Sequence, residues 1–165
     1  MLLSKVIEEL MWGMCTSVEI FLLTLLFSIP LGLLISFCTM SKVKAVKSVF
    51  KVLVWIIRGV PLMLQLFIVY YLPGMLSPTG INPFGKLDNY MYFNWNIDNG
   101  GALLATLIAF AINYAAYFSE IFRGGIMSID KGQFEAGRSL GFNYIQTMIY
   151  VVIPQMFKVV LPTLC

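Results

Sequence analysis

Residues 20–40 read IFLLTLLFSIPLGLLISFCTM, 21 consecutive positions without a charged side chain. A helix of that length is about 30 Å long, which matches the hydrocarbon core of a bilayer. A secretory signal peptide is the alternative. Its apolar segment is only about 7–15 residues and follows basic residues, whereas Glu8, Glu9 and Glu19 precede this one. The stretch therefore predicts a membrane-spanning helix over about 18–40.

Further apolar stretches follow along the chain. Residues 60–76 hold 17 uncharged positions and residues 100–119 hold 20, enough for one span each. A third stretch begins at Ile145 and predicts the start of a fourth span over about 145–165. Because the sequence stops within this apolar pattern, soon after Lys158, we expect the last part of the domain to be missing.

The composition excludes several classes of protein. Hydrophobic residues make up 59 % and charged residues 12 %, against about 45–50 % and about 25 % in soluble domains. Histidine is absent, which removes histidine-dependent catalysis and metal binding. The three cysteines show no CxxC spacing, so no metal site is expected. The net charge of +3 is too small to indicate nucleic acid. We predict an all-α, polytopic membrane domain over residues 1–165.

The basic residues are unevenly distributed between the segments that join the spans. Eight of the 11 lie in residues 41–59 and 120–146, and loops rich in Lys and Arg are cytoplasmic. The N-terminus is then outside. A basic stripe in the first of these segments is expected to face lipid headgroups: Lys44, Lys47, Lys51 and Arg58. The outer segment carries aromatic residues that suit either an interfacial belt or loop packing: Phe84, Tyr90, Tyr92, Phe93 and Trp95.

The uncharged stretches offer no titrating group for an ion or proton path. The chain also lacks the GxxxxGK[ST] pattern that binds ATP, so active transport would need another subunit to supply energy. Gln65, Asn113 and Tyr117 are candidates to line a polar pathway. Hydrogen bonding between helices is the alternative role for Gln65 and Asn113.

A short helix is predicted in the second basic segment. Residues 128–141 read SIDKGQFEAGRSLG. Asp130 and Gln133 have the spacing of a capping box, and Gly141 suits a left-handed position after the helix end. The pattern predicts an amphiphilic helix over about 131–140. Such a helix can fit a groove on a partner protein; lying flat on the membrane is the alternative.

The same segment contains a series of spaced residues: Glu135, Ala136, Gly137, Gly141, Val151, Ile153 and Pro154. The series resembles the EAA motif of ABC importer permeases, which reads E-A-A, three residues, G, nine residues, I, one residue and L-P. The spacing is kept, with Gly for the second Ala, Val for Ile and Ile for Leu. Because glycine costs a helix about 1 kcal/mol relative to alanine, we expect a slightly looser loop at Gly137.

Two other segments are similar to the polar amino acid uptake family of these permeases. RGVPLMLQL at residues 58–66 resembles the family's entry to the second span. AYFSEIFRGGI at residues 116–126, followed by Gly132 and Gln133, resembles its lead into the EAA loop. The resemblance covers residues 16–165 and implies the helical bundle of a type I ABC importer, with five spans, the N-terminus outside and a cytoplasmic coupling helix.

The resemblance implies an ATP-driven importer of polar amino acids in the bacterial inner membrane. Its partners would be a dimer of cytoplasmic ATPases that bind ATP and Mg, a second permease chain and an extracellular or periplasmic amino acid binding protein. This chain would bind no cofactor. The ATPase-docking residues on the coupling helix would be Gly132, Gln133, Glu135, Ala136, Gly137 and Gly141. Residues at the inner membrane edge, with a structural or gating role, would be Arg58, Gly59, Pro61, Glu120 and Arg123.

Ion pairing between helices is the role we expect for Arg58, Glu120 and Arg123. Two other functions stay open at this point. One is a membrane scaffold or sensor that binds a cytoplasmic partner through the same short helix without transport. The other is an integral membrane enzyme that would use Glu120 and Glu135 as paired acids.

Overall fold

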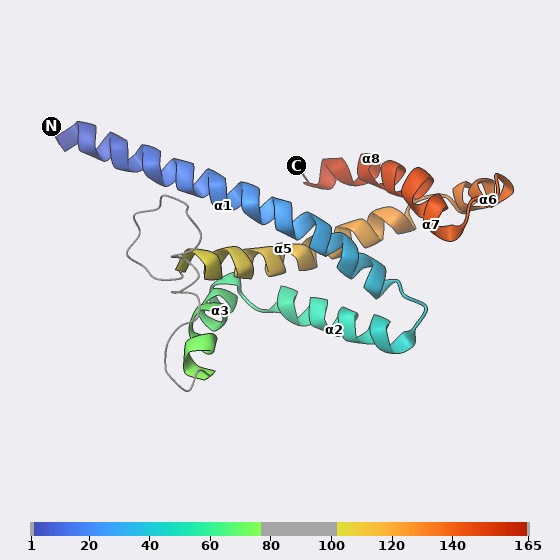
Figure 1. Ribbon diagram of the computed structural model, residues 1–165, viewed down its shortest axis with the longest axis horizontal. Coiled ribbons are helices and arrows are strands. Elements are labelled where there is room, and N and C mark those ends of the chain that lie inside the picture. The colour runs from blue at the N-terminus through green and yellow to red at the C-terminus, as the bar shows by residue number, and fades with distance from the viewer. Residues whose placement is uncertain (1, 77–101, 165) are drawn as a thin grey trace.

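The computed structural model describes residues 2–76 and 102–164, and every regular element in these ranges is a helix (Figure 1). The all-α class predicted from the sequence is confirmed. The aromatic residues predicted for an outer belt lie outside the described residues. The elements are α1 (Leu2–Thr39), α2 (Lys44–Gly59), α3 (Leu62–Leu76), α5 (Ala102–Met127), α6 (Lys131–Ser139), α7 (Tyr144–Thr147), the π-helix η1 (Met148–Val152) and α8 (Ile153–Leu164).

Three helical segments of the described chain are long and apolar enough to cross a membrane: Ser4–Thr39, Leu103–Met127 and Tyr144–Pro162. Helix α1 extends well before the predicted start of the first span near residue 18. The described part of α3 has 15 residues and qualifies only together with α2, as a pair bent by 106°. The bounds of the spans therefore stay a prediction.

The break between α2 and α3 has a local cause. Proline has no N–H group and cannot continue the hydrogen-bond ladder of a preceding helix, but it suits the start of a new one. Val60, just before Pro61, is extended, with φ −93° and ψ 130°. The Pro61 carbonyl then accepts hydrogen bonds from the N–H groups of Leu64 and Gln65, which opens α3.

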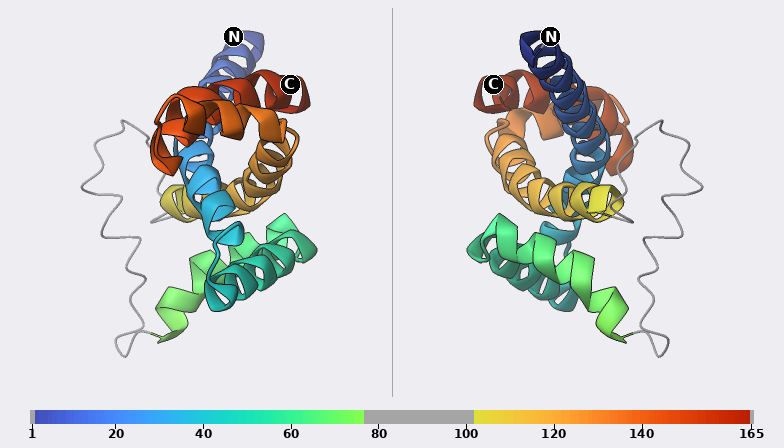
Figure 2. Two further views of the ribbon diagram at one scale, coloured as in Figure 1. Left: turned by 90° about the vertical axis from the view of Figure 1, so that its right-hand side faces the viewer. Right: turned by 90° about the vertical axis from the view of Figure 1, so that its left-hand side faces the viewer.

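The C-terminal half of α1 packs closely against α5, whereas the N-terminal part of α1 projects away from it (Figures 1 and 2). Small residues recur every four positions on α1 and share one face: Thr24, Ser28, Gly32 and Ser36. All three hydroxyl residues of this stripe are buried. A Cβ atom on Gly32 would lie only 2.7 Å from the Phe118 Cβ and 3.1 Å from the Ala115 carbonyl oxygen. Glycine at 32 thus lets the two backbones approach, as small residues do between membrane helices.

A second packed region joins α5 to the C-terminal helices. Its buried side chains come from α5, η1 and α8: Phe118, Phe122, Ile126, Met148, Val152, Met156 and Val160. The π-helix in this region ends at Val152, two residues before Pro154, which cannot donate a backbone hydrogen bond. The Ile153 N–H instead donates to the Met148 carbonyl, five residues back. Local π geometry is one way in which helices accommodate proline.

Helices α2 and α3 lie along one side of this bundle (Figure 2). Both contact α5, and α2 also contacts α1. Helix α6 lies at the end of the molecule where α5 ends, far from the N-terminus (Figure 1). The fold therefore separates two places where polar residues gather: the end that carries α6, and the bend between α2 and α3 beside α5.

Candidate functional site

Helix α6, Lys131–Ser139, begins with a cap that differs from the predicted one. The Asp130 carboxylate accepts a hydrogen bond from the Gly132 N–H at 2.7 Å. The Gln133 side chain does not return to the cap as a capping box requires; its Oε1 accepts from Gln155 Nε2 at 3.0 Å. The predicted capping box is therefore wrong, because Gln133 finds a partner on α8 that its local sequence does not reveal.

A complete capping box occurs one helix later, where we did not predict it. The Gln146 N–H donates to Asn143 Oδ1 at 2.8 Å, and the Asn143 N–H donates to Gln146 Oε1 at 2.9 Å. Asn followed after three residues by Gln is the sequence signal that could have found it. This box starts α7 sharply after the turn that ends α6.

The end of α6 has the geometry predicted for it. Gly141 has φ +80°, in the left-handed region, so the prediction of a left-handed glycine is confirmed. Its N–H donates to the Arg138 carbonyl at 2.9 Å, and the Phe142 N–H donates to the Gly137 carbonyl at 3.0 Å. These two bonds form a Schellman motif, which satisfies carbonyls at the helix end.

Gly137 makes the tightest contact of α6. It is buried, and a Cβ atom there would lie 2.8 Å from Thr147 Cγ2 and 2.9 Å from Thr147 Oγ1. Thr147 is itself buried and its hydroxyl donates to the Asn143 carbonyl at 3.0 Å. The expectation of a looser loop at Gly137 is thus wrong, because the missing side chain lets α6 seat directly on α7.

Gly137→Ala is expected to lift α6 from α7 even though alanine favours a helix by about 1 kcal/mol. The new Cβ would overlap both branches of Thr147, whereas the Thr147 Cβ itself would be 3.4 Å away. Thr147→Ala should therefore restore the seating in the double variant. Amide hydrogen exchange over residues 131–147 measures this: faster exchange in Gly137→Ala, and recovery in the double variant. Equal exchange in wild type and Gly137→Ala would contradict the contact.

The outer surface of α6 and the turn after it is mixed in character. Glu135, Ala136 and Arg138 are exposed. Beside them, three large apolar side chains are exposed: Leu140 at 73 %, Tyr144 at 66 % and Ile145 at 65 %. Tyr144 and Ile145 open the apolar segment Tyr144–Pro162, whereas Leu140 lies in the turn after α6. Exposed apolar side chains that are grouped in this way mark protein or membrane interaction surfaces. We did not single out these apolar residues from the sequence.

Polar residues also meet at the bend between α2 and α3. The Gln65 amide donates to the carbonyls of Ile57 at 2.6 Å and Val60 at 3.0 Å, and lies 3.4 Å from Asn113 Oδ1 on α5. The structure therefore brings the predicted pathway candidates Gln65 and Asn113 together. Their contact is the hydrogen bonding between helices that was the alternative role for both residues.

The same bend brings Arg58 over the ring of Tyr117, with 5.1 Å from the guanidinium carbon to the ring centroid. Glu120 and Arg123 pair with each other on α5, at 2.6 Å. The expected ion pairing between helices is therefore wrong for these groups, because residues three apart on one helix already face each other. This partly exposed pair stabilises the helix by about 0.5 kcal/mol at most.

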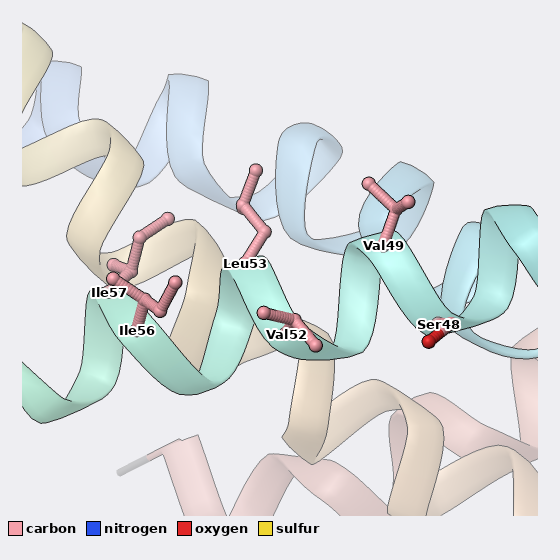
Figure 3. Close-up of a pocket in the computed structure, with 6 residues that line it drawn as sticks. All are labelled: Ser48, Val49, Val52, Leu53, Ile56 and Ile57. Carbon is pink, nitrogen blue, oxygen red and sulfur yellow. The ribbon is translucent and has the colours of Figure 1, made fainter.

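An apolar groove of about 570 Å³ runs along α2 (Figure 3). All of its lining residues belong to that one helix: Ser48, Val49, Val52, Leu53, Ile56 and Ile57. It offers a single hydroxyl and no charge, so it is not a candidate site for a polar solute. Among residues 2–76 and 102–164, no group of three His, Cys, Asp or Glu side chains could bind a metal ion.

Comparison with known proteins gives a consistent picture. The pattern of the family described as binding-protein-dependent transport system inner membrane component matches residues 28–165. The L-cystine transport system permease protein TcyB of Bacillus subtilis (strain 168) is 36 % identical over 152 residues, covering 92 % of this chain and 56 % of TcyB. The arginine transport system permease protein ArtQ of the same organism is 33 % identical over 160 residues, covering 92 % and 61 %.

A solved structure described as "Crystal structure of an amino acid ABC transporter with histidines" has the same fold. Its chain superposes with a TM-score of 0.70 at 34 % identity, over 98 % of this chain and 66 % of that one. The chain thus spans between half and two thirds of the length of these similar proteins.

Proposed function

Because the chain belongs to the family of binding-protein-dependent transport system inner membrane components, we propose that it is a membrane-spanning permease subunit of an ATP-driven importer of polar amino acids. It is a multi-pass protein of the bacterial inner membrane. Relatives named for L-cystine and arginine transport support a polar amino acid as substrate. The chain is a transport component and not itself an enzyme.

We assign energy supply to separate subunits. A dimer of cytoplasmic ATPases would bind ATP and Mg, and this chain would bind no cofactor. A second permease copy, identical or different, would complete the pathway, and an extracellular or periplasmic binding protein would deliver the amino acid. Support comes from the family itself, which is named for its dependence on a binding protein.

Helix α6 is the proposed docking element for the ATPase. It is exposed, sharply capped at both ends and seated on α7 through Gly137. Its exposed motif residues form the proposed docking surface, extended by the exposed apolar residues beside it: Gly132, Gln133, Glu135, Ala136, Gly141, Leu140, Tyr144 and Ile145. Gly137 is buried and would serve the docking helix only by seating it on α7. A rigid helix joined to a span can pass a partner's movement into the membrane.

The membrane-edge and pathway residues belong to the same proposal. Gly59 and Pro61 flank the bend between α2 and α3, where a change of backbone angle would move α3. Arg58, Glu120 and Arg123 would stabilise or gate this inner region, and Tyr117 would lie along the solute path, whereas Gln65 and Asn113 would hold the helices together by hydrogen bonding. Closure of the ATPases would move α6 and switch the cavity between inward-facing and outward-facing states. The N-terminus would be outside and α6 in the cytoplasm.

The scaffold alternative is disfavoured, because the family and the named relatives are transport components. The enzyme alternative needs Glu120 and Glu135 as a pair of acids. In the structure Glu120 forms an ion pair with Arg123, and Glu135 is exposed on α6.

Glu135→Lys is expected to lower the recovery of the ATPase with the tagged chain by about tenfold, because reversing a charge at a docking surface costs on the order of 1–3 kcal/mol. The measurement is purification from native membranes followed by mass spectrometry of the bound proteins, alongside ATP-dependent uptake of labelled amino acids by the same cells.

Lys131→Glu reverses a charge on the same helix outside the motif residues and serves as the matched control. Recovery of the ATPase at wild-type yield from Glu135→Lys would refute docking at Glu135. Binding of a partner by the wild-type chain without any uptake would support the scaffold instead.

A further inference from the structure

The side chain of Gln65 bridges the bend between α2 and α3 by two hydrogen bonds. We propose that Gln65 is a positioning residue: it holds α3 at its angle to α2 and links this bend to α5 through Asn113, so that a shift of α5 is passed to α3. The geometric part of this proposal, which concerns the angle between α2 and α3, depends only on the contacts at the bend. Its consequence for uptake rests on the proposed function.

The bend leaves backbone carbonyls that need partners. Helix α2 ends at Gly59, and α3 begins at Leu62 at an angle of 106°. The last carbonyls of a helix have no partner within it, and Pro61 has no N–H to offer. In apolar surroundings an unpaired carbonyl is strongly unfavourable.

Gln65 supplies the missing donor from the first turn of α3. Its Nε2 donates to the Ile57 carbonyl at 2.6 Å and to the Val60 carbonyl at 3.0 Å. One side chain of α3 therefore binds both the last turn of α2 and the residue in the break. A change in the angle between the helices must lengthen at least one of these bonds.

The third contact connects the bend to α5. A glutamine amide nitrogen carries two hydrogens, yet three acceptors lie within reach of it. Asn113 Oδ1, at 3.4 Å, is the most distant of the three, and Asn113 is only 7 % exposed. A small approach of α5 would strengthen this contact at the expense of a carbonyl of the bend.

A second contact between the bend and α5 lies one helical turn further along α5. The Arg58 guanidinium, in the last turn of α2, stacks over the ring of Tyr117. Asn113 and Tyr117 are four residues apart and share a face of α5. Helices α2, α3 and α5 thus meet at one point, with Gln65 as the residue that contacts all three.

The geometric part is tested by the distance between two spin labels, one on α2 at Val49 and one on α3 at Tyr71. Both positions are exposed, and the native cysteines are replaced first. The chain is measured in lipid nanodiscs. Gln65→Met removes the donor but keeps an unbranched side chain of similar length. Leu64→Met, at the neighbouring exposed position, is the matched control.

We expect a broader distance distribution in Gln65→Met and a wild-type distribution in Leu64→Met. Identical distributions in the two variants would overturn the proposal, whatever the chain transports. Asn113→Leu should leave the distribution centred as in wild type, because both carbonyl bonds remain. A distribution as broad as that of Gln65→Met would show that the bend depends equally on Asn113, and would overturn the assignment of the angle to the carbonyl bonds of Gln65.

The consequence for transport is tested in the importer reconstituted with its ATPase and binding protein. Loss of the bonds of Gln65 is expected to lower the maximal uptake rate about tenfold, with the half-saturating concentration of amino acid unchanged. A raised half-saturating concentration at an unchanged maximal rate would mean that Gln65 contacts the solute and would overturn the positioning role. Absence of ATP-dependent uptake by the wild-type complex would refute the proposed function, without altering the result of the distance measurement.

Discussion

Replacing Gly32 with leucine is expected to separate α1 from α5 and to prevent stable folding of the chain in the membrane. A Cβ at this position would lie 2.7 Å from the Phe118 Cβ, 3.1 Å from the Ala115 carbonyl oxygen and 3.3 Å from the Ser119 nitrogen. Two of these neighbours are backbone atoms, which cannot rotate away. Overpacking of this kind costs about 3 kcal/mol, and the helices can avoid it only by moving apart.

The measurement is the fraction of detergent-extracted protein that stays monodisperse as temperature rises. Gly13→Leu is the matched control, because it places the same side chain on the same helix where no atom lies within 4 Å of the added Cβ. The control should denature at the wild-type temperature. Equal denaturation temperatures for the two variants would show that α1 and α5 do not pack through Gly32.

Replacing Gly125 with leucine is the second change expected to have a large effect. The added Cβ would overlap Val160 Cγ2 and lie 2.9 Å from Met156 Cγ, both on α8. These two side chains are fully buried, so they have little room to yield, and a cost of about 3 kcal/mol is again expected. Since α8 continues from the segment that seats α6, the variant should also misplace the proposed docking helix.

Two readouts check this prediction: thermal denaturation in detergent, and recovery of the ATPase from native membranes. Gly124→Leu is a close control, because it lies one residue away with no atom within 4 Å of its added Cβ. We expect Gly125→Leu to lose both stability and ATPase recovery. A Gly125→Leu protein as stable as Gly124→Leu would mean that α5 and α8 are not in contact at this glycine.

The two glycines next to each other illustrate the limit of sequence reasoning. Gly124 and Gly125 belong to one motif and look equivalent in the sequence, but only Gly125 faces α8. Likewise, the departure of Gly137 from the EAA pattern predicted a looser helix from its propensity alone. Thr147, ten residues away, makes the same glycine a point of close packing.

The hydrogen-bond and ion-pair partners of the polar residues could not be predicted from the sequence either. Gln133 has the spacing to cap its own helix, yet it bonds to Gln155. Glu120 and Arg123 were expected to pair between helices and instead pair within α5. Gln65 was a candidate for the solute path, and the structure places it at the bend with two backbone carbonyls as partners.

By itself, the sequence determined the all-α class and the left-handed turn at Gly141. These features depend on interactions within a few residues of the chain: transfer of apolar side chains out of water, helical hydrogen bonding and glycine's freedom at positive φ. Only the tertiary structure decided the bend of α3 beside α5, the close contacts of Gly32, Gly125 and Gly137, and the partners of Gln65 and Gln133. Those depend on which distant segments approach each other, and packing between helices sets that rather than local propensity.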